Sequence, residues 1–164
     1  MHDARRWPVL WIVSSALLAL LTACASTSRV ALPVTTATSG PIQIATSHRT
    51  YPVNRPIGIV ITNQSKTTYY VLNTYSNCDI AQLQYYDTPQ AKWVNTQPCN
   101  QAIQKQVLKI PGSFTEPLTF APGNSTSNPN EWRIGTYRVQ LRYSSQSDGG
   151  GTLTDAYSAT FVVK

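Results

Sequence analysis

The chain has 164 residues, of which 41% are hydrophobic and 12% are charged, and its formal net charge is +6. This length suits one domain of ordinary size. The basic residues are scattered, and only Arg138 and Arg142, with Arg133 nearby, come close together in a pattern typical of a solvated strand face. The charge balance therefore does not predict a nucleic-acid partner.

The N-terminal segment has the layout of an export signal. Arg5 and Arg6 precede an apolar run from Trp7 to Leu21, which closes on Leu21-Thr22-Ala23-Cys24. This motif resembles the lipobox of bacterial lipoprotein signal peptides. The resemblance implies that residues 1–23 are a cleaved signal, that Cys24 carries acyl chains, and that the mature protein is held outside the cytoplasm at a cell membrane or outer membrane.

Two alternatives remain open for this segment. It could be an uncleaved transmembrane anchor, although it is shorter than the roughly 20 apolar residues that span a bilayer, or the signal of a secreted protein without lipid. Stable anchoring takes two acyl chains rather than one, and the lipoprotein resemblance implies two or three. Ala25 follows the cysteine where inner-membrane lipoproteins carry Asp, which permits an outer-membrane location or a single-membrane cell.

The segment after Cys24 is predicted to be a tether. Ala25–Gly40 is rich in Ser, Thr, Ala and Val and has no acidic residue, so it buries too little apolar surface to order itself. We therefore divide the chain into a signal peptide (1–23), a lipidated cysteine with a flexible linker (24–40) and one domain (41–164).

From Pro41 onward the hydrophobic period is two rather than 3.6, which predicts strands. The predicted strands are Pro41–Thr46, Pro56–Thr62, Thr67–Thr74, Ile80–Tyr86, Lys92–Thr96, Gln106–Ile110, Phe114–Phe120, Tyr137–Tyr143 and Thr152–Val163. The turn residues Asp87-Thr88-Pro89-Gln90 join two of them into a hairpin.

The clearest strand is Tyr137–Tyr143, where apolar or aromatic odd positions alternate with Arg138, Gln140 and Arg142, giving one buried and one wet face. Ser144–Gly151 is expected to be a mobile hairpin loop, and Cys99–Gln106 is the one plausible helical stretch. Eleven prolines and closely spaced strands indicate an all-β, antiparallel β-sandwich.

Cys78 and Cys99 remain once Cys24 is assigned to lipid. In an oxidising compartment such a pair predicts a disulfide, which would close a loop worth about 3 kcal/mol in the chain-entropy estimate. A metal site or a catalytic thiol is the alternative, but two cysteines without a neighbouring histidine do not complete a zinc shell.

Several short motifs then follow one another in an order similar to a known family. These are Ile59–Ser65, Lys92-Trp93-Val94, Leu108–Gly112 and Gly135–Val139. They resemble bacterial immunoglobulin-like domains, in particular the intracellular proteinase inhibitor (BsuPI-type) domains. The resemblance implies an immunoglobulin-like sandwich and, as an alternative function, proteinase inhibition. The cysteine pair and the export signal depart from the family pattern and fit an exported relative, and no residue matches a reactive site.

Structural roles are predicted for two aromatic residues. Tyr137 opens the penultimate strand, where sandwiches often place a tyrosine whose hydroxyl bonds back to nearby backbone; an ordinary core position is the alternative. Trp132, just after the polar loop Asn124–Asn130, is assigned to the structure as well.

The search for catalytic chemistry is negative. His48 is the single histidine after processing, so neither a histidine metal site nor a histidine-activated nucleophile is predicted. The acidic residues, such as Asp79 and Asp87, are better explained by turns than by the paired carboxylates of a glycosidase. We predict no enzyme activity, no cofactor and no metal.

The aromatic residues, unlike the candidate catalytic residues, indicate a function, which is binding. The neighbouring pairs Tyr69-Tyr70 and Tyr85-Tyr86 each place one ring outward on a strand, and Trp93 lies close to the second pair. These five residues are candidate binding residues, with core packing as the alternative. The predicted function is that of a lipid-anchored, extracytoplasmic binding or structural surface module. Its partner would be a protein or glycan of the cell envelope.

Overall fold

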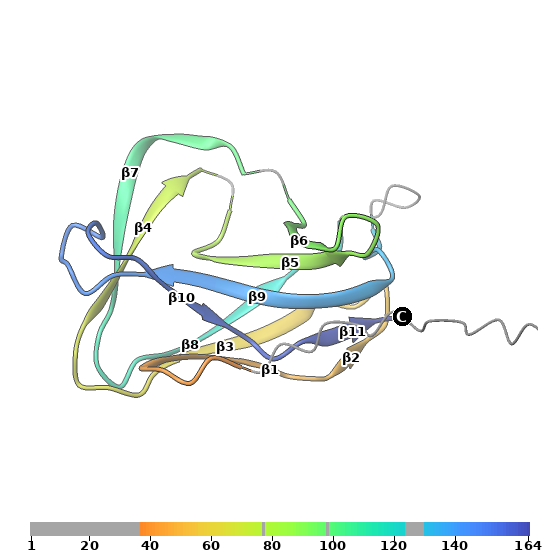
Figure 1. Ribbon diagram of the computed structural model, residues 1–164, viewed down its shortest axis with the longest axis horizontal. Helices are drawn as coiled ribbons and strands as arrows, with labels where there is room; N and C mark the ends of the chain where they lie inside the picture. The colour runs from red at the N-terminus through yellow and green to blue at the C-terminus, as the bar shows by residue number, and fades with distance from the viewer. Residues whose placement is uncertain (1–36, 77, 98, 124–129) are drawn as a thin grey trace, which may run out of the picture. The chain divides into compact units, whose positions relative to one another are not determined.

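The computed structural model describes residues 37–76, 78–97, 99–123 and 130–164, all within one compact unit, Ala31–Lys164. The predicted signal peptide, Cys24 and most of the predicted linker lie outside these residues. The described part is all-β and contains no helix (Figure 1). Its strands are β1 (Ile42–Thr46), β2 (Thr50–Tyr51), β3 (Ile57–Asn63), β4 (Tyr69–Tyr75), β5 (Ala81–Asp87), β6 (Lys92–Asn95), β7 (Gln101–Ile110), β8 (Thr115–Phe120), β9 (Gly135–Tyr143), β10 (Thr154–Tyr157) and β11 (Phe161–Val163).

The strands form three sheets. One has the order β1-β3-β8; the largest has the order β2-β11-β9-β5-β6, with β10 also paired to β9; β4 and β7 form a pair of their own. Every pairing is antiparallel except that of β2 with β11. The β4–β7 pair rises away from the other sheets (Figure 1).

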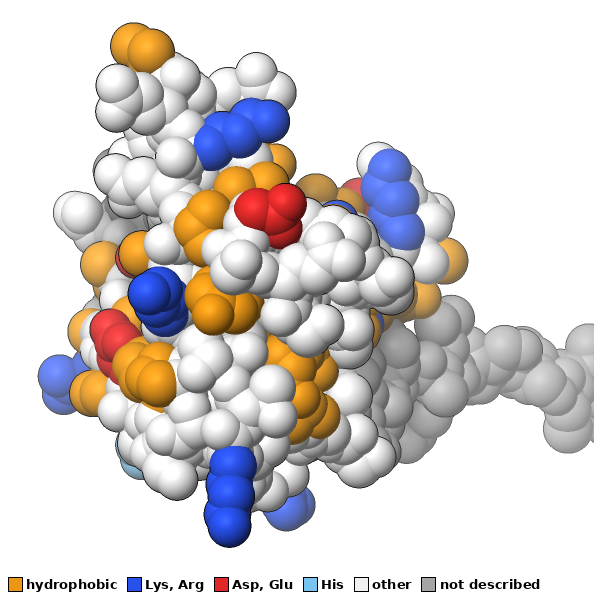
Figure 2. Space-filling model, turned by 90° about the vertical axis from the view of Figure 1, so that its left-hand side faces the viewer, with side chains coloured by type: hydrophobic (Ala, Val, Ile, Leu, Met, Phe, Trp, Pro, Cys, Tyr) orange, Lys and Arg blue, Asp and Glu red, His pale blue; other side chains and the backbone are white. Residues whose placement is uncertain are grey.

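Charged side chains are spread over the surface. On the face shown in Figure 2, lysine and arginine side chains stand apart, with polar and apolar side chains between them. This arrangement agrees with their scatter along the sequence. Within the described ranges, no helix has the length and apolar character needed to cross a membrane.

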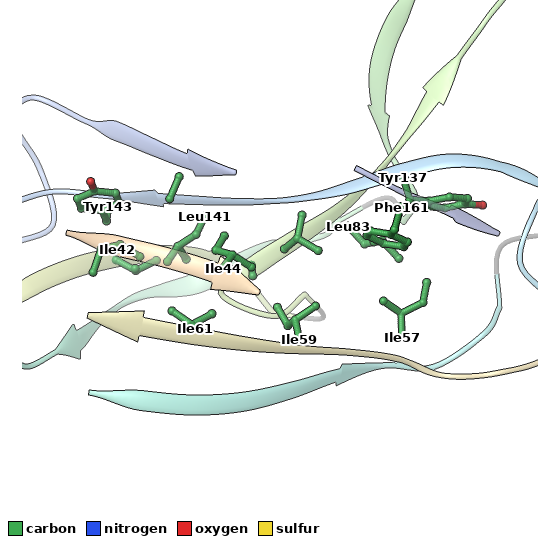
Figure 3. Packing of buried hydrophobic residues seen from close by; sticks show 14 of the residues in the cluster. Ile42, Ile44, Ile57, Ile59, Ile61, Leu83, Tyr137, Leu141, Tyr143 and Phe161 are labelled. Atoms are coloured by element: carbon green, nitrogen blue, oxygen red, sulfur yellow. The ribbon is translucent and has the colours of Figure 1, made fainter. Parts of the chain in front are cut away.

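The core lies between the β1-β3-β8 sheet and the largest sheet. Ile57, Ile59 and Ile61 of β3 are at most 2% exposed, because alternate side chains of a strand point to the same face. They face Tyr137, Leu141 and other residues of the opposite sheet (Figure 3). Two sheets that bury facing sides in this way are consistent with a β-sandwich.

Buried polar groups fix the ends of the strands. The Asn63 side chain is fully buried and donates hydrogen bonds to the carbonyls of Thr67, Ile110 and Pro111. It thereby joins the end of β3 to the end of β7. Trp132 is 2% exposed, and its indole N–H donates to the Arg55 carbonyl over 2.7 Å.

The hydroxyl of Tyr137 donates a hydrogen bond to the carbonyl of Arg133, four residues upstream. Its ring stacks on Phe161 with centroids 5.9 Å apart. The phenol is buried, and this burial raises the pKa of Tyr137 to about 12. Tyr137 therefore contributes both to the core and to the start of β9.

The predicted helical stretch Cys99–Gln106 is wrong, because β7 begins at Gln101. Ala, Gln and Lys favour a helix there, but this weak preference gives way to pairing with β4, in which Tyr75 lies opposite Gln101. The predicted closing strand Thr152–Val163 is also divided, into β10 and β11. It breaks at Ser158, whose hydroxyl accepts a hydrogen bond from the Val139 N–H.

Ordered contacts begin within the segment that the sequence assigns to the linker. The Thr38 N–H donates to the Tyr157 carbonyl over 3.0 Å, and the Thr38 hydroxyl accepts from the Tyr157 N–H over 2.8 Å. The chain therefore lies along β10 before β1 starts.

Candidate functional site

The outer face of the largest sheet carries a cluster of side-chain amides. Gln82 and Gln84 of β5 lie opposite Gln140 and Arg138 of β9, and Gln84 also lies opposite Asn95 of β6. These positions alternate with the core residues of the same strands, so the amides point away from the core. We call Gln82, Gln84, Asn95 and Gln140 the amide cluster.

Hydrogen bonds among its members fix the amide cluster. The Gln84 amide donates to Asn95 over 3.0 Å and to Gln140 over 2.8 Å, and the Asn95 amide donates to Gln82 over 3.0 Å. Gln84 is only 8% exposed and also accepts a hydrogen bond from Arg138 Nε over 2.9 Å. A network of this kind holds each amide in one orientation.

Arg138 lies between two aromatic rings beside the cluster. Its guanidinium carbon is 4.3 Å from the centroid of the Trp93 ring and 4.2 Å from that of the Tyr157 ring. The Trp93 ring in turn meets Tyr86 edge-on, at 5.3 Å. Burial lowers the pKa of Arg138. These contacts hold the cation by cation–π attraction rather than leaving it free for an anion.

A groove of about 490 Å³ lies over the amide cluster. All four amides line it, together with β4 residues such as Leu72 and Tyr75 and with Gly149, Gly150 and Leu153 from the β9–β10 connection. Cavities of this size hold small ligands or short stretches of polymer.

The wall between β4 and the β9–β10 connection is closed by a close backbone contact. Tyr70 and Ser144 exchange two backbone hydrogen bonds of 2.8 Å, which joins β4 to the residue after β9. Gly149, with a φ of +69°, lies so close that a Cβ on it would be 3.1 Å from the Leu72 nitrogen and 3.0 Å from its Cβ. Only glycine fits this position without strain.

The connection that forms this wall is held by local hydrogen bonds. The Ser144 hydroxyl donates to the Gly150 carbonyl and accepts from the Gln146 N–H, and the Gly149 N–H donates to the Gln146 carbonyl. Ser144 and Gly149 are buried. The predicted loop Ser144–Gly151 thus lies in a defined conformation against β4.

The groove carries little net charge. Asp79 and Arg142 are its charged lining residues among those described. Arg142 binds both carboxylate oxygens of Asp155, at 2.9 and 3.3 Å. The hydrogen bond from Arg142 lowers the pKa of Asp155, so this carboxylate stays ionised beside the guanidinium.

The five predicted binding residues do not share one face. Tyr69 packs edge-on against Tyr143, with centroids 5.1 Å apart, and Tyr85 lies 6.3 Å from Tyr137 in the core. Tyr69, Tyr70 and Tyr85 are all partly buried. Tyr86 and Trp93 do come together, next to the amide cluster.

Sequence reasoning did not find the amide cluster. The usable signal was the period of two, which places Gln82, Gln84 and Gln140 on outward faces of two strands. Their convergence depends on the pairing of β5 with β9, which brings together residues 56 positions apart.

The predicted disulfide between Cys78 and Cys99 is present, with Cα atoms 5.7 Å apart. It joins the connection between β4 and β5 to the connection between β6 and β7. A small cavity of about 30 Å³ lies beside it, with room for about one water molecule. Among the described residues, no group of three or more potential metal ligands occurs.

Comparison with known proteins gives no family. No protein-family model matches the chain, and no curated protein matches it significantly. The alkylpurine DNA glycosylase AlkC of Pseudomonas fluorescens, solved bound to DNA containing an abasic-site analogue, is 6% identical over 77% of this chain and 31% of its own, with a TM-score of 0.39. A mutant β-glucosidase of Listeria innocua in complex with laminaribiose is 11% identical over 78% of this chain and 16% of its own, with a TM-score of 0.31.

The chain thus spans a third or less of the length of these solved proteins. Likeness at these TM-scores carries no argument about fold or function. The function has to be argued from this chain's own residues.

Proposed function

We propose that this protein is a lipid-anchored, extracytoplasmic binding module of a bacterial cell envelope that acts through the groove over the amide cluster. The observation that carries the proposal is the groove itself. It is of ligand size, and its floor consists of amides held in fixed orientations by hydrogen bonds to one another. Groups fixed before a ligand arrives lose little entropy on binding.

Anchoring is supported by the lipobox resemblance at Leu21–Cys24 and by the disulfide, which is stable in oxidising compartments. We further propose that the domain is a variant of the immunoglobulin-like sandwich. The Tyr137 hydroxyl bond to upstream backbone and the buried Trp132 support this finer assignment.

Cell fractionation tests the anchor. Cys24→Ala should move the protein from the membrane fraction to the soluble fraction, because the acyl chains attach at this sulfur. Ser26→Ala, two residues away, should leave it in the membrane. If Cys24→Ala stays with the membrane, an uncleaved apolar segment is the anchor instead.

Envelope binding tests the groove. Leu153 lines the groove and is 50% exposed, so Leu153→Trp should fill part of it and reduce binding to isolated cell-envelope material. Ile134 is 72% exposed and does not line the groove, so Ile134→Trp is the matched control. Equal binding by both variants and the unaltered protein would remove the groove as the binding site.

A further inference from the structure

The groove also indicates the chemical class of its ligand. We infer that it binds an uncharged oligosaccharide, a conclusion that rests on the proposed binding function. The amide cluster supplies donors and acceptors, the guanidinium at the groove is already paired, and β5 and β9 beneath it have no free edge.

The hydrogen-bonding capacity of the cluster matches a saccharide. A primary amide has two N–H donors and one carbonyl acceptor. Gln84 uses both donors and its acceptor internally, whereas Gln82 accepts from Asn95 and no described residue accepts from its own N–H groups. Gln140 donates to the Tyr157 hydroxyl over 3.4 Å and also forms a side-chain hydrogen bond with Asp155. Gln82 and Asn95, which donates once, to Gln82, thus retain side-chain donors next to each other, as neighbouring sugar hydroxyls require.

The charge distribution argues against an ionic ligand. Of the two charged lining residues, Arg142 is already bound to Asp155, and Asp79 is a single exposed carboxylate. An anionic sugar would meet a guanidinium that has its partner, and a cationic ligand would meet one exposed carboxylate. Apolar side chains, Leu72 and Leu153 among them, offer contact to the C–H faces of sugar rings.

The backbone arrangement argues against a peptide that binds as an extra strand. Such a peptide needs a free strand edge. On the floor, β5 is paired on both sides, with β6 and β9, and β9 is paired with β5 and β10, whereas β6, which carries Asn95, is the edge strand of the sheet. On the wall, Gly149 covers the edge of β4 at Leu72. Recognition over β5 and β9 must therefore come mainly from side chains.

Titration of the purified full chain with named probes tests the inference. The neutral probes are cellotetraose, maltotetraose and the tetramer of N-acetylglucosamine; tetragalacturonate is the anionic probe, and a Ser/Asn-rich neutral octapeptide is the peptide probe. We expect at least one neutral tetrasaccharide to bind and to shift the side-chain amide NMR signals of Gln82 and Asn95, with at least tenfold weaker binding of the anion and the peptide.

Matched variants locate the site. Gln82→Ala and Asn95→Ala should each weaken saccharide binding roughly tenfold, the effect of one hydrogen bond of about 1.4 kcal/mol. Gln43 and Gln64 form a comparable amide pair on the other sheet, at 2.8 Å, and Gln64→Ala should leave binding unchanged. An equal loss in Gln64→Ala would contradict the assignment.

The outcomes separate this inference from the proposed function. If no neutral tetrasaccharide binds, or if the octapeptide or the anion binds more tightly, the saccharide class is wrong. The groove would still stand as a binding site if Leu153→Trp reduced envelope binding. If Leu153→Trp had no effect there, the proposed function itself would fall.

Discussion

The two facing sheets and the β4–β7 pair are stabilised in different ways. In β3 and β9, side chains alternate between buried and more exposed, and the buried ones form one continuous core. In β7, only Ile110 at the end of the strand is buried, and Ile103 is fully exposed. Hydrophobic burial thus stabilises the sheets, whereas the far part of β7 depends on backbone pairing with β4 and on the disulfide near its start.

This difference matters for the groove, because the groove has one surface from each region. Its floor belongs to the largest sheet, and one wall belongs to β4. A wall that depends on a cross-link can be loosened without unfolding the floor. In many proteins, one region opens at a lower free energy than the rest of the fold.

The largest expected effect comes from the core. Phe161 is 1% exposed and contacts the rings of Tyr51 and Tyr137, so Phe161→Ala should reduce the free energy of unfolding by about 3–5 kcal/mol. Ile103→Ala in β7 should change it by less than about 0.5 kcal/mol. Urea unfolding of both variants measures the contrast, and similar losses would contradict the division into two regions.

The next effect comes from the disulfide. The double variant Cys78→Ser, Cys99→Ser should lose about 3 kcal/mol in the chain-entropy estimate. Hydrogen exchange should become faster in β4 and β7 than in β9, since the cross-link lies next to the first two. A reducing agent should reproduce both changes in the unaltered protein and have no effect on the double variant. Uniform loss of protection would show that the bridge stabilises the whole domain instead.

The same division explains what the sequence could predict. The alternation of Tyr137–Tyr143, the β-branched run of β3 and the turn between β5 and β6 depend on local chemistry, and all three features were predicted. The disulfide was predicted because two cysteines in an oxidising compartment usually bond to each other. In each case, the decisive information lies within a few neighbouring residues or in residue type.

The features that were missed depend on distant partners. β2 has two residues and forms only because Thr50 and Tyr51 pair with β11. The first half of β7 has helix-favouring residues, and β4 decides its conformation. The amide cluster needs the β5–β9 register, and the groove needs the position of β4. Neither can be read from the hydrophobic period of one segment.

A smaller effect is expected at Tyr137, where the core meets the start of β9. Tyr137→Phe should lose about 1 kcal/mol, the worth of one hydrogen bond. The folded-state pKa of Tyr137, about 12, lies above the ordinary value of 10.0. Its contribution is therefore complete below pH 10 and declines as pH rises towards 12, because the unfolded state loses the proton first.

Unfolding measurements between pH 8 and pH 12 test this expectation. The difference in stability between the unaltered protein and Tyr137→Phe should shrink above pH 10. A constant difference across this range would mean that the phenol is not buried in the way described. Tyr143→Phe is a useful comparison, because burial also raises the pKa of Tyr143.

The smallest effect is expected at the ion pair beside the groove. The Arg142 side chain is 59% exposed, so Asp155→Asn should cost less than about 1 kcal/mol near pH 7, and less still in high salt. The folded-state pKa of Asp155 lies below its ordinary value, so its contribution is present above about pH 4 and lost as pH falls through the lowered pKa.

The sharper readout of this variant is ligand binding. Removing the carboxylate leaves Arg142 unpaired at the edge of the groove, so Asp155→Asn should bind tetragalacturonate more tightly while its binding of neutral tetrasaccharides changes little. Glu116→Gln, which removes a carboxylate from the other sheet, should change neither. An unchanged affinity for the anion in Asp155→Asn would contradict the view that Asp155 masks the Arg142 charge, because an unmasked guanidinium at the edge of the groove should attract the anion.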